Sequence, residues 1–96
     1  EMHQEPHVLN FGKAGNGPTI TAGMALAIEP MITRGSAKTK VLADEWTVVS
    51  VDQSRGAHFE HSYAICPDGK PFVLTSPDGG KAELARFGVE ISELLA

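Results

Sequence analysis

The segment MALAIEPM, residues 24–31, most constrains how this chain can fold, because it sets a carboxylate and a proline in an otherwise apolar run. Leu26, Ile28 and Met31 are residue types that are usually buried, whereas an ionised carboxylate is costly to remove from water. Pro30 cannot donate a hydrogen bond to a β-ladder, so the run predicts a short strand that Pro30 closes. Glu29 therefore needs a cation, a metal ion or several hydrogen-bond donors beside it.

Alternation along this predicted strand separates small side chains from large ones. Successive side chains of a strand point to opposite faces, so Glu29 shares its face with Ala25 and Ala27, while Leu26 and Ile28 share the other. The small side chains leave room beside the carboxylate.

The rest of the chain is typical of short strands separated by turns. Residues 12–23 hold four glycines and a proline, a loop composition. β-branched or alternating runs predict strands over residues 46–52, 58–66 and 71–76. The turn PDGK joins the last two, which should pair antiparallel. Apolar residues within 81–95 approach helical spacing, although Gly88 interrupts them.

Size and charge exclude several classes of protein. The chain has 96 residues, about one small domain, and a formal net charge of -4, which argues against nucleic acid or an anionic membrane as its main partner. No apolar run approaches the ~20 residues that span a bilayer. The lone Cys66 excludes an internal disulfide, fits a reducing compartment and suits a small buried thiol. The opening EMHQEP has neither an initiator Met nor a polar lead-in, so we expect a segment of a longer chain.

A second carboxylate lies in the strand HFEHSYAIC. Alternation places His58 and Glu60 on one face and His61 on the other, where His61 is expected to be a hydrogen-bonded residue rather than a ligand. Glu29 and Glu60 could meet across neighbouring strands. Paired carboxylates suit hard divalent ions and bridge two-metal centres, although a glutamate in a strand is more often a solvated residue on an exposed face.

Two further positions are candidates on weaker grounds. His3 and His7 flank QEP in a loop that could present a side chain to a cleft, and the alternative is a surface histidine. Trp46, beside two acidic residues, is either a core residue or a pocket wall. The sequence has no phosphate-binding glycine loop, nucleophile elbow or zinc-ligand spacing.

Four motifs in order, MHQEPHVLNFG, GMALAIEPM, DEWTVVSVD and AHFEHSYAI followed by VLT, resemble the C-terminal half of the type I methionine aminopeptidases. The resemblance covers residues 1–75, expected to be the C-terminal portion of the catalytic domain, and leaves residues 76–96 as a tail, expected to be helical. GKAGNGPTITAG and AKTKVLADEW look most like actinobacterial members. The implied fold is the α/β (α+β) pita-bread fold with a curved antiparallel sheet, incomplete without its N-terminal half.

The resemblance also implies a function and a set of site residues. The family removes the initiator methionine from nascent polypeptides in the cytoplasm, using two divalent metal ions of the Co, Mn, Fe, Zn or Mg class. By motif, Glu29 binds one metal and accepts a proton, Glu60 bridges both metals, and His3 hydrogen-bonds the substrate. Met2 and Trp46 match the wall of the methionine pocket, with Met2 where many members carry phenylalanine. Ribosome association is a further expectation, and neither nucleic acid nor a membrane is required.

The family's remaining ligands, two aspartates and a histidine, come from upstream sequence, so we expect the isolated segment to bind metal weakly and to be inactive. Three alternatives stay open. An aminopeptidase P or prolidase would share the fold, although AIEPM and HFEH speak against it. The others are a pita-bread peptide-binding module without catalysis, and a small β-rich domain whose glutamates are satisfied by hydrogen bonds.

Overall fold

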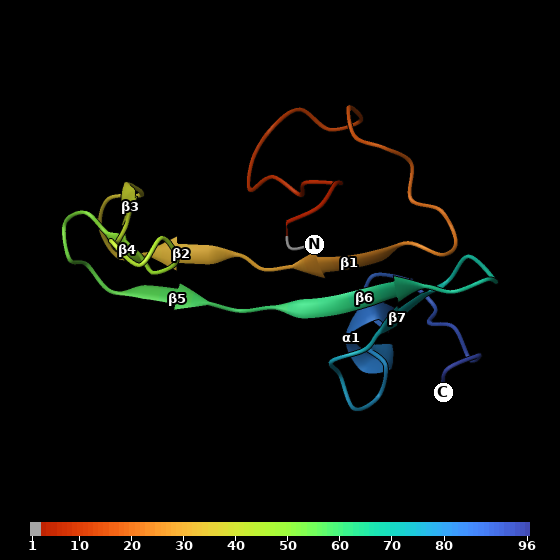
Figure 1. Cartoon of the computed structure of the whole chain (residues 1–96). Coiled ribbons are helices and arrows are strands. Elements are labelled where there is room, and N and C mark those ends of the chain that lie inside the picture. Colours follow the sequence, from red (N-terminus) through yellow and green to blue (C-terminus); the bar gives the residue numbers. More distant parts are fainter. Residues whose placement is uncertain (1–2) are drawn as a thin grey trace. The chain divides into compact units, whose positions relative to one another are not determined.

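The structure, a computed structural model, describes residues 3–96 and divides them into two units (Figure 1). Unit 1 holds residues 3–28 and 60–96, and unit 2 holds residues 29–59. Short strands dominate, and every strand pairing is antiparallel, in agreement with the expected class. The elements of the described residues are β1 (Ala25–Ile28), β2 (Met31–Thr33), β3 (Thr39–Val41), β4 (Val48–Ser50), β5 (Gly56–His58), β6 (His61–Ile65), β7 (Pro71–Val73) and α1 (Lys81–Ala85).

Unit 1 is built on a three-stranded sheet with the order β1-β6-β7. The predicted strand over MALAIE is β1, which pairs with β6 from Ala25 opposite Ala64 to Ile28 opposite His61. The predicted hairpin joins β6 to β7, and its turn is closed by the Gly69 N–H, which donates to the Cys66 carbonyl oxygen at 2.8 Å. The loop over residues 12–23 contains no strand or helix, as expected.

The core of unit 1 is small. Among the described residues, the buried apolar side chains are Cys66, directly after β6, and Val73 of β7. Ser92, from the end of the chain, is fully buried beside them. Its N–H donates to the Pro71 carbonyl oxygen at 2.9 Å and its hydroxyl donates to the Asp68 carboxylate at 2.9 Å. These hydrogen bonds join the end of the chain to β7 and to the β6–β7 turn, within the segment that was expected to be a helical tail.

The helix α1 is far shorter than the helical pattern over 81–95. Before it, the Asp78 carboxylate accepts hydrogen bonds from the N–H groups of Ala82 and Gly80, both at 2.9 Å, and so satisfies donors that a helix start leaves free. The helix ends at Ala85 because Gly88 adopts a φ of 70°, outside the helical region. Within the described residues, no helix has the length and apolar character to cross a membrane.

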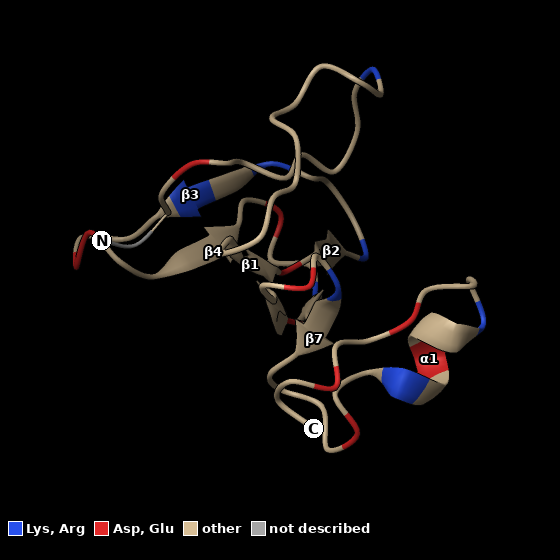
Figure 2. Ribbon diagram, turned by 90° about the vertical axis from the view of Figure 1, so that its right-hand side faces the viewer, with Lys and Arg blue, Asp and Glu red and all other residues tan. Residues whose placement is uncertain are grey.

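Unit 2 consists of two two-stranded ladders, β2–β5 and β3–β4. The Asp52 carboxylate accepts hydrogen bonds from the N–H groups of Ser36, at 2.7 Å, and Ser54, at 3.0 Å, and so joins the loop after β2 to the loop after β4. Lys40 lies on β3, part of which has the blue colour of Lys and Arg in Figure 2.

Three predicted strands are shorter in the structure. The strand predicted over 71–76 ends at Val73, as β7. The strand predicted over 46–52 begins only at Val48, because the Asp44 carboxylate accepts hydrogen bonds from the N–H groups of Trp46 and Thr47 and holds them in a turn. The strand predicted over 58–66 is divided into β5 and β6, with Phe59 and Glu60 between them.

Candidate metal centre

The candidate centre lies where two ladders follow one another along the same pair of chain segments. The β1–β6 ladder ends with Ile28 opposite His61, and the β2–β5 ladder begins with Met31 opposite His58. Between them the Phe59 N–H donates to the Pro30 carbonyl oxygen at 3.2 Å. The register is therefore the same on both sides of the interruption. The two predicted metal-binding glutamates are the residue directly after Ile28 and the residue directly before His61.

Glu29 contacts a histidine. Its carboxylate oxygen Oε2 lies 3.1 Å from Nε2 of His58, and both residues belong to unit 2. The side chains are 40% exposed for Glu29 and 48% exposed for His58. Glu29 is therefore not the buried carboxylate that its apolar neighbours suggested. Ile28 and Met31 are themselves exposed, so the described part of the chain provides little apolar surface against which Glu29 could be desolvated.

Three side chains offer metal-ligand atoms at this place. Glu29, His58 and Glu60 each contribute one such atom, and these atoms all lie within 4.8 Å of one another. Two carboxylates and an imidazole form a mixed oxygen and nitrogen donor set, which divalent first-row metals accept. The residues present thus fit a divalent ion, and three ligands leave coordination positions for groups from elsewhere.

The other residues predicted for the site are less informative. His3 is exposed and has a backbone φ of 58°, and Met2 lies outside the described residues. Trp46 is 67% exposed in a turn rather than in a strand. His61 is hydrogen-bonded through Nδ1 to the Thr75 hydroxyl at 2.7 Å, as expected of a hydrogen-bonded residue. The roles of His3, Met2 and Trp46 stay predictions.

His58 is the functional candidate to which the sequence reasoning gave no role. Alternation did place it on the same face as Glu60, two positions further along. The signal that identifies it is the register, which sets His58 opposite Met31 and thus diagonal to Glu29. That diagonal relation cannot be inferred from the sequence, because it depends on the pairing of β2 with β5.

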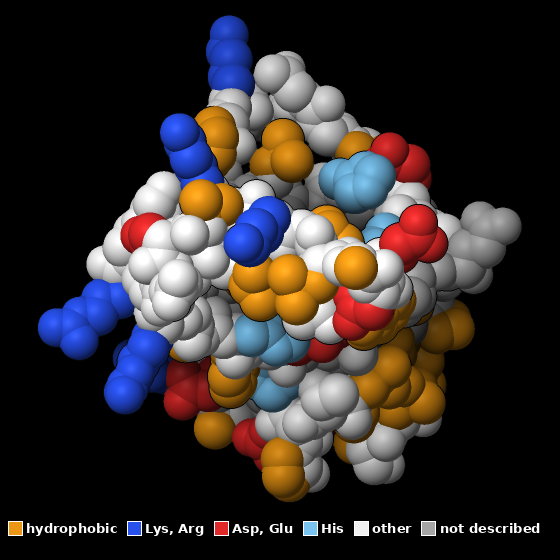
Figure 3. Space-filling view, turned by 60° about the vertical axis from the view of Figure 1, so that its left-hand side comes forward, with side chains coloured by type: hydrophobic (Ala, Val, Ile, Leu, Met, Phe, Trp, Pro, Cys, Tyr) orange, Lys and Arg blue, Asp and Glu red, His pale blue; other side chains and the backbone are white. Residues whose placement is uncertain are grey.

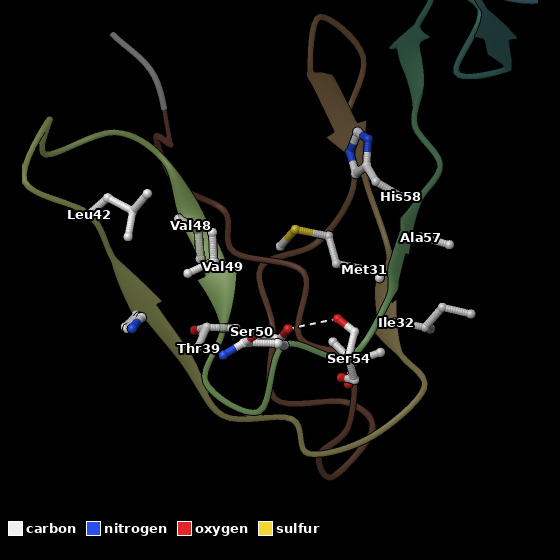
Figure 4. A pocket seen from close by; sticks show the side chains of 14 residues that line it. Met31, Ile32, Thr39, Leu42, Val48, Val49, Ser50, Ser54, Ala57 and His58 are labelled. Carbon is white, nitrogen blue, oxygen red and sulfur yellow. Dashed lines mark hydrogen bonds between the residues drawn. The ribbon is translucent and has the colours of Figure 1, made fainter.

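A groove of about 740 Å³ opens beside His58 within unit 2. Figure 4 shows Met31 and His58 on the side of β2 and β5, and Val48 and Val49 on β4 across the groove. At one end of the groove, the Ser50 hydroxyl donates to the Ser54 carbonyl oxygen at a distance of 2.7 Å. Trp46, predicted as a pocket wall, is not among its lining residues. The lining is mainly apolar and ends at the candidate centre.

Comparison with known proteins shows which enzymes this chain is similar to. No protein-family model matches the chain. Over 75 residues it is 51% identical to a methionine aminopeptidase of Clostridium perfringens and 52% identical to methionine aminopeptidase 1 of Mycobacterium tuberculosis, in each case covering 78% of the chain. The chain is similar to part of a methionine aminopeptidase. It spans only 30% and 28% of the length of these two relatives.

A solved structure shows the same likeness in three dimensions. The crystal structure of the methionine aminopeptidase of Thermotoga maritima matches 79% of this chain and 30% of its own, at 43% identity and a TM-score of 0.67. The likeness confirms the expected fold class, a strand-rich part of the pita-bread fold with antiparallel sheets. The described residues also hold a donor set that fits a divalent metal ion, Glu29, His58 and Glu60.

Proposed function

We propose that this chain is part of a metal-dependent enzyme that removes the N-terminal methionine from nascent polypeptides. The observation that carries the proposal is the clustering of Glu29 and Glu60 with His58, because these two glutamates are the residues that the motifs assign to metal binding. Their clustering is what a metal site requires of the fold. Identity of about half the matched residues to methionine aminopeptidases supports the same activity.

The proposal gives each residue a task. Glu29 and Glu60 would hold two divalent ions, and such ions, when bound, polarise a carbonyl and lower the pKa of water. The Glu29 carboxylate accepts the proton that the attacking water loses, and His3 hydrogen-bonds the substrate near the scissile carbonyl. Met2 and Trp46 line the pocket for the methionine side chain. Motif matching supports these assignments.

The narrower parts of the proposal follow from the same motifs. Residues 1–75 form the catalytic portion and residues 76–96 a tail, in a type I enzyme that acts in the cytoplasm and associates with ribosomes. An actinobacterial origin is supported by the loop segments GKAGNGPTITAG and AKTKVLADEW. Neither nucleic acid nor a membrane is a required partner.

A chimera tests the activity. The residues matched in this chain replace the corresponding stretch of the Thermotoga maritima enzyme, and release of methionine from a Met-Ala-Ser peptide is followed with added Co²⁺ or Mn²⁺. The chimera is expected to be active. Glu29→Gln should lower its kcat by roughly 10²–10⁴-fold, the usual contribution of a positioned acid or base, because a glutamine neither accepts the proton nor binds the ion as a carboxylate.

Glu45→Gln is the matched control, since Glu45 is an exposed glutamate in a turn of unit 2 and should leave kcat unchanged. Circular dichroism establishes that each chimera is folded. A folded chimera that releases no methionine, or one in which Glu29→Gln and Glu45→Gln behave alike, would contradict the proposed function.

A further inference from the structure

We infer that the imidazole of His58 is a third protein ligand of the candidate metal centre. This inference deepens the proposed function and rests on it. It adds a nitrogen donor to a site that the motifs describe, within this chain, by carboxylates alone.

The distance between His58 and Glu29 suits two ligands of a single ion. Two atoms that each lie about 2.1 Å from an ion, at the angles of octahedral or tetrahedral coordination, are about 3.0–3.4 Å apart. Nε2 of His58 and Oε2 of Glu29 are 3.1 Å apart. The two residues belong to the same unit, so this geometry depends only on the local β2–β5 ladder and the residues next to it.

The position of His58 on β5 brings its ring to the Glu29 carboxylate. It is the last residue of β5 and pairs with Met31 of β2, two positions after Glu29, so it is the diagonal cross-strand neighbour of Glu29. One ligand atom of each of Glu29, His58 and Glu60 lies within 4.8 Å of the other two. At 48% exposure the His58 ring is also accessible to an ion arriving from solvent.

A nitrogen ligand changes which ion the centre prefers. Carboxylate oxygens alone suit Mg²⁺ and Mn²⁺, whereas imidazole favours Zn²⁺, Fe²⁺ and similar ions of intermediate softness. With His58 as a ligand, the centre should discriminate for Zn²⁺ against Mn²⁺. A histidine that only hydrogen-bonds Glu29 would not produce this discrimination, because it adds no donor to the ion.

The chain contains a matched pair that lacks the third group. His7 and Glu5 also lie in contact, with Nδ1 and Oε1 2.9 Å apart, and both are exposed. Among the described residues, however, the only group of three clustered ligand residues is that of Glu29, His58 and Glu60. The His7–Glu5 pair is therefore a control for what one histidine and one glutamate can do.

The experiment measures Zn²⁺ and Mn²⁺ binding to the chain by competition with a chromophoric indicator, at concentrations too low for association. His58→Gln should weaken Zn²⁺ binding by about tenfold or more, and Mn²⁺ binding much less. Glu29→Gln should weaken both, and His7→Gln neither. In the ¹⁵N-histidine-labelled chain, Zn²⁺ should shift the Nε2 resonance of His58 to the position of a ligated nitrogen while Nδ1 keeps its proton.

The outcomes separate this inference from the proposed function. If Glu29→Gln weakens binding while His58→Gln does not, and the ring resonances of His58 stay in place, His58 is not a ligand although the carboxylate centre stands. If neither substitution changes the binding of either ion and the ring resonances stay in place, Glu29, His58 and Glu60 form no metal site in this chain, whereas methionine release by the chimera tests the proposed function separately. If His58→Gln disturbs the fold, the ring resonances of the unsubstituted chain still show whether His58 is a ligand.

Discussion

At the scale of single residues, Asp52 shows how one exposed carboxylate organises unit 2. Hydrogen bonds from the backbone N–H groups of Ser36 and Ser54 lower the pKa of Asp52 from 3.8 to about 2. The charged form is favoured because both carboxylate oxygens accept hydrogen bonds from backbone N–H groups. Glu29 contrasts with it, since its carboxylate contacts a side chain, His58, which a bound ion could share.

This lowered pKa makes the loops of unit 2 sensitive to acid. Because the pKa is lower in the folded state than in the unfolded one, the stabilisation is fully present above the unfolded value of 3.8 and is lost as the pH falls toward 2. We expect the amide resonances of Ser36 and Ser54 to move together over this range. Asp52→Asn should abolish that transition. A carboxyl resonance of Asp52 that titrates at its ordinary pKa would contradict the prediction.

At the scale of elements, two glycines before α1 allow the chain to approach β7 closely. Gly79 and Gly80 have φ values of 66° and 83°, and a Cβ at Gly80 would lie 2.5 Å from Cγ2 of Val73. Val73 is one of the few buried side chains, so this approach covers part of the small core. Gly69 in the β6–β7 turn has a similar φ of 77°, but a Cβ there would meet nothing within 4 Å.

A comparison of Gly69 with Gly80 separates the cost of backbone strain from the cost of overpacking. Gly69→Ala should lower the free energy of unfolding by about 1–2 kcal/mol, the cost of a left-handed conformation for an L-residue. Gly80→Ala should lower the free energy of unfolding by about 1–3 kcal/mol more than Gly69→Ala does, because the added methyl group overpacks Val73. Urea titration of both variants measures the difference. Equal losses would show that the contact between Gly80 and Val73 contributes nothing.

At the scale of the whole molecule, the chain leaves much of its apolar surface in water. Its accessible surface is 8077 Å², whereas a compact monomer of this mass exposes about 5,300 Å². Figure 3 shows hydrophobic side chains among charged ones on the surface. The exposed large residues include Phe11, Trp46 and Phe87. Surfaces of this kind are usually covered by further protein, which agrees with a chain that spans about a third of its relatives.

We therefore expect the isolated chain to associate. Light scattering coupled to size-exclusion chromatography should show a mass that rises with protein concentration, because association removes apolar surface from water. The same residues within the chimera, where the rest of the enzyme covers them, should remain monodisperse. A compact monomer that melts cooperatively at every concentration would overturn this expectation.

The local organisation of the chain could be predicted because it depends on neighbouring residues. The loop over residues 12–23, the strand that Pro30 closes and the β6–β7 hairpin follow from glycine, proline and turn chemistry. The division of the strand predicted over 58–66 could not be foreseen, because alternation continues through Phe59 and Glu60 and only the partner strands reveal the change. The helical tail was overestimated for a related reason, since the packing of Ser92 against β7 directs those residues elsewhere.

By itself, the sequence determined the antiparallel, strand-rich class, the resemblance to methionine aminopeptidases and the two glutamates of the candidate centre, since each depends on residue type and order. Only the tertiary structure decided that Glu29 is half-exposed and that His58 contacts it. The physical reason is that burial and diagonal contacts depend on strand register. The β1–β6 and β2–β5 ladders join segments about thirty residues apart, and no local pattern determines that pairing.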